Sequence, residues 1–150
     1  MSIEEIAKGY EAATQKFLDA VAAFPVAKLD EPKKDGWNAR QIIHHLADSE
    51  SQSYARLRRL IAEPGSVIQG YDENKWAASE VLGYKDLPIE NSLALFKASR
   101  EASLTIIKRL TPELLNNSGM HSESGEYSIN KWLTGYTNHP QDHAKQLLAD

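Results

Sequence analysis

The chain has 150 residues, a length that predicts a single domain over residues 1–150. Its 17 basic and 21 acidic side chains give a net charge of −4, which argues against a nucleic-acid partner. Its lack of cysteine excludes disulfides, thiolate metal sites and a cysteine nucleophile, so any metal would need imidazole, carboxylate or backbone ligands. Because no apolar run approaches the ~18–20 residues of a membrane span and the N-terminal segment has no signal-peptide core, we expect a cytoplasmic protein without membrane association.

Apolar residues recur at helical spacing in four stretches of the chain. Ser2 with Glu5, and Asn38 with Gln41, have the spacing of a capping box, in which each side chain binds a free backbone N–H at the helix start. Ser128 is placed to cap the last stretch. The four predicted helices are Ile3–Phe24, Ala39–Ala62, Pro88–Leu110 and Ile129–Leu148.

No segment shows the alternating pattern of a strand, so the sequence predicts an all-α fold, a four-helix bundle. The connection over residues 63–87 is long, and at ~3.3 Å per extended residue it can return along a helix of ~36 Å. The sequence therefore allows an up-down-down-up chain path. We expect a short helix near Asp72–Ala78 in this connection, and a short extra turn that starts at Thr111-Pro112-Glu113.

Pro140 lies inside the last predicted helix. Proline has no backbone N–H, so it removes the hydrogen bond to the carbonyl of Tyr136 and usually kinks the helix axis. We therefore expect a local irregularity in this helix, at the position that follows His139.

Three of the five histidines are candidate metal ligands. His139 and His143 are four residues apart, which places both rings on one helix face. Of the adjacent pair His44 and His45, His45 falls on the apolar stripe with Ile42, which favours it as the inward ring. Three imidazoles with open coordination positions are typical of a catalytic metal site. The alternative is three unrelated histidines, each satisfied by a local hydrogen bond.

Other charged and polar residues allow two interpretations. The cluster Arg56, Arg58 and Arg59 is either a solvated helix face or an anion-binding surface. His121 lies in a polar segment before the last helix, where it is either a loop residue or a group at the mouth of the site.

Three segments resemble the DinB-like metalloprotein superfamily, in particular its YfiT-type branch. Residues 36–50, GWNARQIIHHLADSE, resemble the signature of that superfamily, and residues 71–76, YDENKW, resemble the segment that follows in the branch. Residues 138–143, NHPQDH, match its C-terminal His-x-x-x-His. The order and spacing of the segments agree across nearly the whole chain, and together they are quite specific.

The resemblance implies an up-down-down-up four-helix bundle that holds one divalent metal ion, zinc or nickel. By position, the implied ligands are His45, His139 and His143. It also implies a metal-dependent hydrolase or a thiol S-transferase that uses bacillithiol or a related low-molecular-weight thiol, and a homodimer.

The leading hypothesis is a metal-dependent enzyme in which a water or thiol attacks a small electrophilic substrate. Asp48, one turn from His45, is a candidate catalytic carboxylate that would orient an imidazole or transfer a proton, or else an exposed helix acid. Tyr71, Asp72 and Trp76 either line the cleft or pack the long connection onto the bundle. The alternative function is a non-catalytic, dimeric bundle that binds a metal or small ligand.

Overall fold

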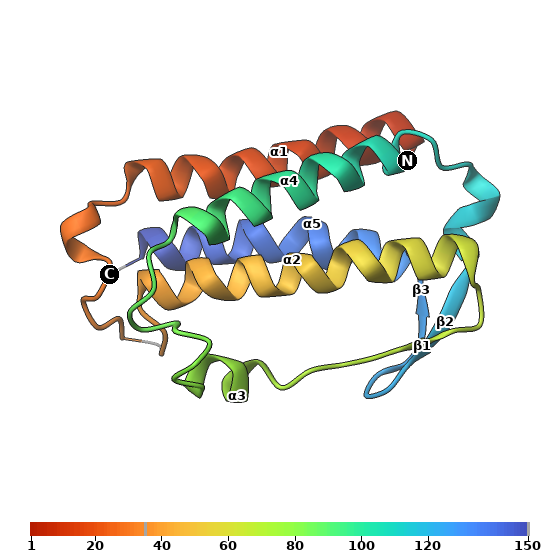
Figure 1. Ribbon diagram of the computed structural model, residues 1–150. Helices are drawn as coiled ribbons and strands as arrows, with labels where there is room; N and C mark the ends of the chain where they lie inside the picture. The colour runs from red at the N-terminus through yellow and green to blue at the C-terminus, as the bar shows by residue number, and fades with distance from the viewer. Residues whose placement is uncertain (35, 150) are drawn as a thin grey trace.

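The computed structural model describes residues 1–34 and 36–149, which form a helical bundle with a small sheet at one end (Figure 1). The helices are α1 (Ile3–Ala23), α2 (Ala39–Ala62), α3 (Glu73–Ala78), α4 (Glu90–Ile107) and α5 (Ile129–Leu148), with short 3₁₀ helices η1 (Val26–Lys28) and η2 (Pro112–Asn116). The strands are β1 (Val67–Ile68), β2 (Ser118–His121) and β3 (Gly125–Ser128). The four long helices confirm the predicted bundle. Within the described residues, no helix is both long and apolar enough to cross a membrane.

The predicted helix starts are confirmed by their capping contacts. Ser2 Oγ accepts a hydrogen bond from the Glu5 amide at 3.1 Å, and Asn38 Oδ1 accepts one from the Gln41 amide at 2.9 Å. Ser128 Oγ accepts from the Lys131 amide in the same way. These contacts satisfy N–H groups that have no partner inside the helix, and α2 and α5 accordingly have the predicted bounds.

Helix α4 is shorter than predicted, because it begins at Glu90 and ends at Ile107. The carbonyl of Leu87 bonds to the side chains of Arg40 and His44 on α2, which holds the residues before α4 outside the helix. The short helix in the long connection and the turn from Pro112 are both present, as α3 and η2.

The chain path through the bundle is up-down-down-up (Figure 1). Helices α1 and α5 run side by side in one direction, and α2 and α4 run side by side in the other. The extensive helix contacts within the described residues are α1 with α5, α5 with α2, α2 with α4, and α4 with α1. Helices that follow one another in the chain, α1 and α2 or α4 and α5, therefore lie diagonally across the bundle.

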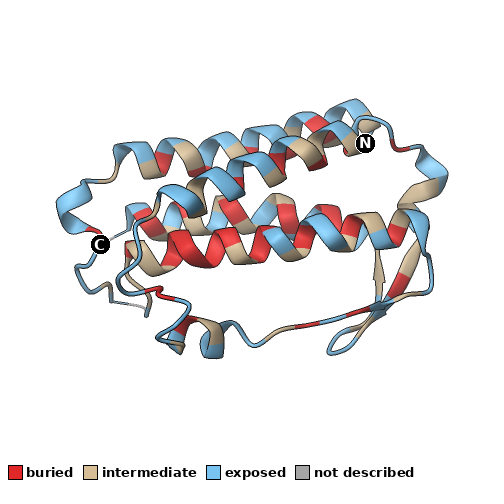
Figure 2. Cartoon of the chain, in the orientation of Figure 1, coloured by how far each residue is buried: buried red, intermediate tan, exposed pale blue. Residues whose placement is uncertain are grey.

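The core has two apolar clusters, and the buried positions line the inward faces of the four helices (Figure 2). Trp132 and Tyr10 stack in the first cluster, with ring centroids 5.9 Å apart, and Phe17 packs against Phe96 in the second. Burying one such side chain stabilises the fold by about 1.5–3 kcal/mol. Between the clusters lies a fully buried ion pair, Glu50 with Arg100, whose N···O distance is 3.0 Å.

The small sheet corrects the prediction that the chain has no strands. Strand β2 pairs with β3 as an antiparallel hairpin, and β1 pairs in parallel with β2 on its other edge. The strands have two to four residues and contain Gly119 and Gly125, so they show no apolar alternation. His121 ends β2 and is not a loop residue, because its backbone pairs with both neighbouring strands.

Candidate metal centre

Three histidines from two helices converge in the bundle. His45 comes from α2, and His139 and His143 come from successive turns of α5. One nitrogen from each ring lies within 4.8 Å of the other two. The Nε2 atoms of His45 and His139 are 3.0 Å apart, and the ring centroids of His139 and His143 are 4.6 Å apart.

The rings are positioned differently on the two helices. The capped start of α2 fixes the direction of the helix, and Trp37, just before the cap, packs its ring 4.7 Å from the ring of His45. His45 is buried, whereas His139 and His143 are half-buried and face the same side of α5 because they are four residues apart. The cluster is thus closed toward α2 and partly open along α5.

All three imidazoles are held in the neutral form. Burial lowers the pKa of His45 to about 3 and the pKa of His139 to about 2, and the neighbouring ring of His143 adds to both shifts. Burial also lowers the pKa of His143, against opposing contributions from Gln146 and Asp142. Neutral imidazole is the form that binds a metal ion, so the site needs no deprotonation at neutral pH.

The donor set fits a divalent metal ion. Nδ1 of His143 donates to Gln146 Oε1 at 2.7 Å, so its Nε2 carries the free lone pair. Nε2 of His45 and Nε2 of His139 face each other, and the buried Nδ1 of His45 has no partner. Two ligands at about 2.0–2.1 Å from one ion are separated by about 2.9–3.4 Å, close to the observed 3.0 Å. An ion between them would accept a lone pair from each Nε2, in place of the hydrogen bond that one ring can donate to the other.

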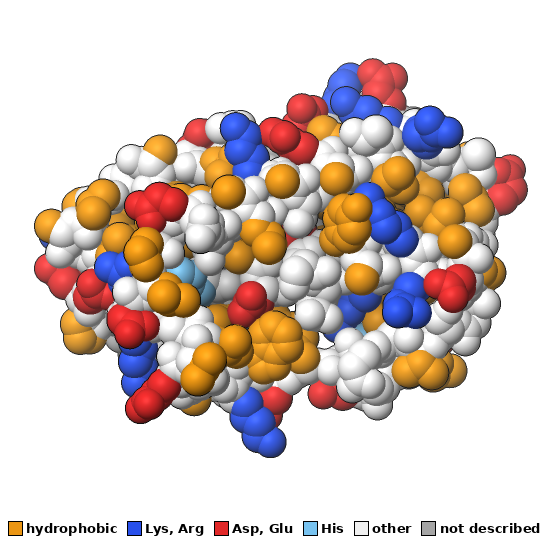
Figure 3. Space-filling model, in the orientation of Figure 1, with side chains coloured by type: hydrophobic (Ala, Val, Ile, Leu, Met, Phe, Trp, Pro, Cys, Tyr) orange, Lys and Arg blue, Asp and Glu red, His pale blue; other side chains and the backbone are white. Residues whose placement is uncertain are grey.

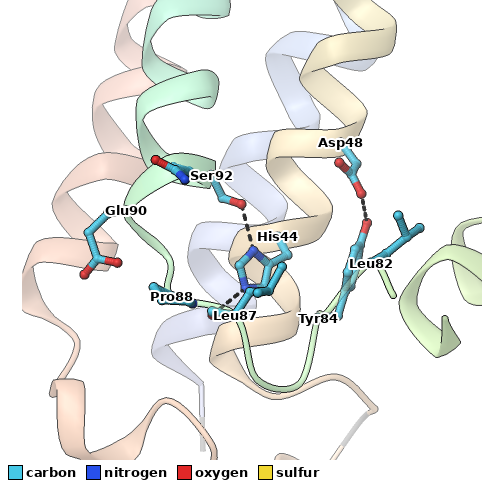
Figure 4. Close-up of a pocket in the computed structure, with 9 residues that line it drawn as sticks. His44, Asp48, Leu82, Tyr84, Leu87, Pro88, Glu90 and Ser92 are labelled. Carbon is cyan, nitrogen blue, oxygen red and sulfur yellow. Dashed lines mark hydrogen bonds between the residues drawn. The ribbon is translucent and has the colours of Figure 1, made fainter. Parts of the chain in front are cut away.

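The structure separates His44 from the other histidines. Its Nδ1 lies 2.7 Å from Ser92 Oγ and its Nε2 lies 3.0 Å from the carbonyl oxygen of Leu87 (Figure 4). Both ring nitrogens are therefore used in fastening α2 to the start of α4. This leaves His45 as the inward ring of the pair, in agreement with its place on the apolar stripe.

The side chain of Asp48 is bonded to the long connection and not to the three histidines. Its carboxylate accepts a hydrogen bond of 2.5 Å from the hydroxyl of Tyr84, at the pocket that His44 also lines (Figure 4). Within the described residues, no hydrogen bond joins Asp48 to an imidazole of the cluster. The predicted orienting contact to an imidazole is instead made by Gln146, and Ser49 Oγ lies 3.5 Å from Nδ1 of His139.

No role for Gln146 or Ser49 was predicted from the sequence, although the spacing of each along its helix indicates that it lies beside a histidine. Gln146 follows His143 by three residues, which is a spacing that places side chains together on a helix. Ser49 follows His45 by four residues on the same stripe of α2. Neither is distinctive alone, because glutamine and serine are common on helix surfaces.

The long connection brings Tyr71 near the cluster. Burial raises the pKa of Tyr71 to about 12, and the neighbouring Ser49 opposes this shift. The buried hydroxyl of Tyr71 has no hydrogen-bond partner, and its ring packs 4.5 Å from that of Trp76. Asp72 is exposed and caps α3 through the amide of Lys75. Tyr71 thus neighbours Ser49, the residue whose Oγ lies 3.5 Å from Nδ1 of His139, and Trp76 packs against its ring.

The predicted arginine cluster divides into separate roles. Arg56 donates to the hydroxyl of Tyr136 at 3.1 Å and to the carbonyl of Gln69 at 2.8 Å, which ties the long connection to the bundle. The guanidinium of Arg58 lies over the ring of Tyr54, and Arg59 is exposed. Acidic and basic side chains are interspersed over the face in Figure 3, which shows no continuous basic surface.

The fold and the cluster together define a four-helix-bundle protein with a three-histidine candidate metal centre. The chain belongs to the DinB superfamily, whose family model matches residues 10–147. This finding agrees with the resemblance seen in the three sequence segments.

Curated relatives carry names that refer to metal. A protein of Oceanobacillus iheyensis named "Putative metal-dependent hydrolase" is 40% identical over 117 residues, which are 78% of this chain and 66% of that protein. YfiT of Bacillus subtilis, with the same description, is 31% identical over 139 residues, 91% of this chain and 77% of its own length. The chain thus spans about two thirds to three quarters of these relatives.

Solved structures share the fold. The structure of Bacillus subtilis YfiT, described as a probable metal-dependent hydrolase with an unusual four-helix bundle topology, superposes with a TM-score of 0.83 at 26% identity, over 98% of this chain and 87% of that one. A mycothiol-dependent maleylpyruvate isomerase superposes with a TM-score of 0.78 at 15% identity, over 99% of this chain and 62% of that one. The second likeness shows the fold alone.

Proposed function

We propose that the protein is a divalent-metal-dependent enzyme, with the ion held by His45, His139 and His143. The observation that supports this most is the convergence of three neutral imidazoles within 4.8 Å. Bringing three neutral imidazoles together in a largely buried position is costly unless their nitrogens are satisfied, and one ion would satisfy a nitrogen of each ring. The metal-dependent hydrolase names of the relatives support the same class of reaction.

The reaction we propose is attack by water or a low-molecular-weight thiol on a small electrophilic substrate. A divalent ion with open coordination positions lowers the pKa of such a nucleophile and polarises the group under attack. Gln146 holds the ring of His143, and the half-buried sides of His139 and His143 leave an approach along α5. The buried hydroxyl of Tyr71 has no partner and is the proton donor or substrate contact that we assign to the connection.

A thiol nucleophile would have to come from outside the chain, because the sequence has no cysteine. The maleylpyruvate isomerase that shares this fold is described as dependent on such a thiol, mycothiol. We therefore include bacillithiol and related thiols in the proposed reaction. A small-molecule substrate fits the partly closed position of the cluster between α2 and α5.

Metal content tests the first half of this proposal. The purified protein is loaded with zinc, nickel or manganese, freed of excess metal, and measured by elemental analysis, with about one ion expected per chain. His143→Ala should abolish or greatly weaken binding, whereas His121→Ala, which alters a histidine of the hairpin outside the cluster, should not. Equal occupancy in both variants, or none in wild type after loading, would refute the three-histidine assignment.

An activity screen tests the second half. Loaded protein is combined with low-molecular-weight thiols and generic electrophiles, and separately with ester and amide substrates. We expect turnover that disappears on chelation and in His143→Ala. A loaded protein that stays silent with every nucleophile and substrate would instead favour the non-catalytic metal-binding bundle.

A further inference from the structure

A buried arginine ties all four long helices together one turn away from the metal centre. Arg100 of α4 donates from Nη1 to Glu50 Oε1 of α2 at 3.0 Å, and its side chain is fully buried. Its other donors reach α1, at Thr14 Oγ1 (2.8 Å) and the carbonyl of Tyr10 (3.2 Å). The guanidinium carbon also lies 3.6 Å from the centroid of the Tyr10 ring.

The remaining contact of this arginine is to α5. Arg100 Nη1 donates to the carbonyl oxygen of Tyr136 at 2.6 Å. In an uninterrupted helix this carbonyl would accept from the N–H of residue 140, but residue 140 is proline and has none. A buried carbonyl without a donor destabilises the fold. Arg100 therefore supplies the hydrogen bond that Pro140 removes.

The Tyr136 carbonyl lies close to the part of α5 that carries His139 and His143. Tyr136 is one turn before His139, and Pro140 lies between His139 and His143. Despite the proline, α5 continues from Ile129 to Leu148, and both imidazoles remain on one face toward His45. The direction of these rings depends on the backbone at this turn, because i and i+4 residues align only while the helix is regular.

We propose that Arg100 is a positioning residue for the metal centre: by replacing the main-chain hydrogen bond that Pro140 removes, it keeps His139 and His143 aligned on His45. This inference rests on the proposed metal function and goes beyond it by assigning a role to a residue that touches no ligand. Glu50 makes the role compatible with burial, because its carboxylate balances the guanidinium charge and is itself bonded to Ser53 Oγ at 2.7 Å.

Arginine suits this role because its planar group has several donors in fixed directions. One guanidinium serves Glu50, Tyr136, Thr14 and Tyr10 at once. A lysine keeps the charge for Glu50, but its single ammonium group cannot reproduce this set of directions. Arg100→Lys therefore disturbs the hydrogen bond to the Tyr136 carbonyl while it keeps the positive charge beside Glu50.

The test is a double-mutant cycle between positions 100 and 140, with zinc or nickel affinity measured by competition with a chromophoric chelator. Pro140→Ala restores an N–H for the Tyr136 carbonyl, so the arginine becomes dispensable there. We expect Arg100→Lys to weaken metal binding about 10-fold with Pro140 in place, and less than about 2-fold in the Pro140→Ala background. Equal losses in both backgrounds, or no loss in either, would overturn the positioning role.

Amide hydrogen exchange in the metal-free protein gives a readout that does not depend on metal binding. In Arg100→Lys, the amides of Gln141, Asp142 and His143 should exchange about 10-fold faster relative to amides of α1, and Pro140→Ala should restore protection. Uniformly faster exchange along all helices would indicate general destabilisation and contradict the proposal. If wild type binds no metal, the proposed function fails, while this measurement still decides whether Arg100 holds α5.

Two further variants guard against misfolding and against a charge effect. Glu50→Gln removes the ion pair and keeps Arg100, so exchange at residues 141–143 should stay protected relative to α1; its loss would point to the charge pair. If Arg100→Lys does not fold, the double variant Glu50→Gln/Arg100→Met is used instead, because it leaves no unpaired buried charge. Its hydrogen exchange is compared with and without the additional change Pro140→Ala. Fast local exchange only where Pro140 is retained supports the proposal, and background-independent exchange refutes it.

Discussion

The Nε2 atoms of His45 and His139 lie 3.0 Å apart, although the two residues are 94 positions apart in the chain. They meet because α2 and α5 pack as antiparallel neighbours in the bundle. Neither nitrogen has a charged partner, and burial keeps both rings neutral. The two lone pairs can therefore be satisfied together by one cation, which makes this pair the centre of the proposed site.

The depressed pKa values predict that the metal-free protein loses stability in mild acid. The ordinary histidine pKa is 6.5, whereas in the folded protein burial lowers it to about 3 for His45 and to about 2 for His139. Below pH 6.5 these two imidazoles bind protons in the unfolded chain but stay neutral in the folded protein. The free energy of unfolding therefore falls as pH falls from about 6.5 toward 3.

Urea unfolding in the presence of a chelator, between pH 7 and pH 4.5, measures this effect. Each imidazole that is protonated only in the unfolded chain contributes a slope of about 1.4 kcal/mol per pH unit. The variant His139→Gln/His143→Gln lacks two of these groups and should show a flatter profile. An equally steep profile in that variant would assign the acid sensitivity to other groups.

Gln146 is expected to tune metal affinity without changing the fold. It accepts the Nδ1–H of His143 at 2.7 Å, which fixes the ring and its tautomer. Gln146→Ala should weaken metal binding about 10- to 100-fold, the usual range for an outer partner of a histidine ligand. Gln146→Glu keeps an acceptor and should retain tight binding, and Gln141→Ala on the same helix serves as the matched control. Equal affinities for Gln146→Ala and Gln141→Ala would show that the contact has no role.

Tyr84 is expected to stabilise the long connection and not the metal centre. Its hydroxyl donates to Asp48, and its ring is buried beside His44. Tyr84→Phe removes a hydrogen bond to a charged acceptor and should lower the free energy of unfolding by about 1.5–3 kcal/mol. Metal affinity should change by less than about 2-fold. A loss of affinity comparable to that of Gln146→Ala would instead connect Asp48 with the centre, as its predicted catalytic role requires.

Two glycine substitutions should have opposite effects on stability. A Cβ at Gly119 of β2 would collide with the carbonyl oxygen of Ser66, which is backbone and cannot move aside easily. Gly119→Ala should therefore destabilise the protein by about 1–3 kcal/mol in thermal or urea unfolding. Gly135 of α5 has open space, so Gly135→Ala should stabilise it by about 0.5–1 kcal/mol. The reverse order would mean that the parallel β1–β2 pairing is not a tight contact.

The sequence predicted the bundle and the grouping of His45 with His139 and His143 because both depend on regular spacing. The caps Asn38 and Ser128 mark helix starts, and the pair His139 and His143 needs only the geometry of a single helix. The sheet could not be predicted, because β1 pairs with β2 across about fifty intervening residues and neither strand has an apolar pattern. Such pairing depends on where the bundle places the two connections.

Contacts between helices were likewise hidden from the sequence. Asp48 is one turn from His45 on α2, but its carboxylate points to Tyr84, a residue of the long connection whose position no local pattern indicates. Arg100 lies at helical spacing with Phe96 and Ser103 on the buried face of α4, but spacing along one helix does not show that its partners are Glu50 and Tyr136. The proline at position 140 identified the carbonyl that lacks a donor, while the donor itself became visible only in the packed bundle.

The diagonal placement of consecutive helices also determines how the chain can be divided. Every extensive helix contact in the described residues joins the first pair, α1 and α2, to the second pair, α4 and α5, so neither pair can bury its apolar faces alone. Two copies that opened at the connection over residues 63–87 could exchange helix pairs and recover all these contacts. Such an exchanged dimer would rebuild two complete centres, each with His45 from one chain and His139 and His143 from the other.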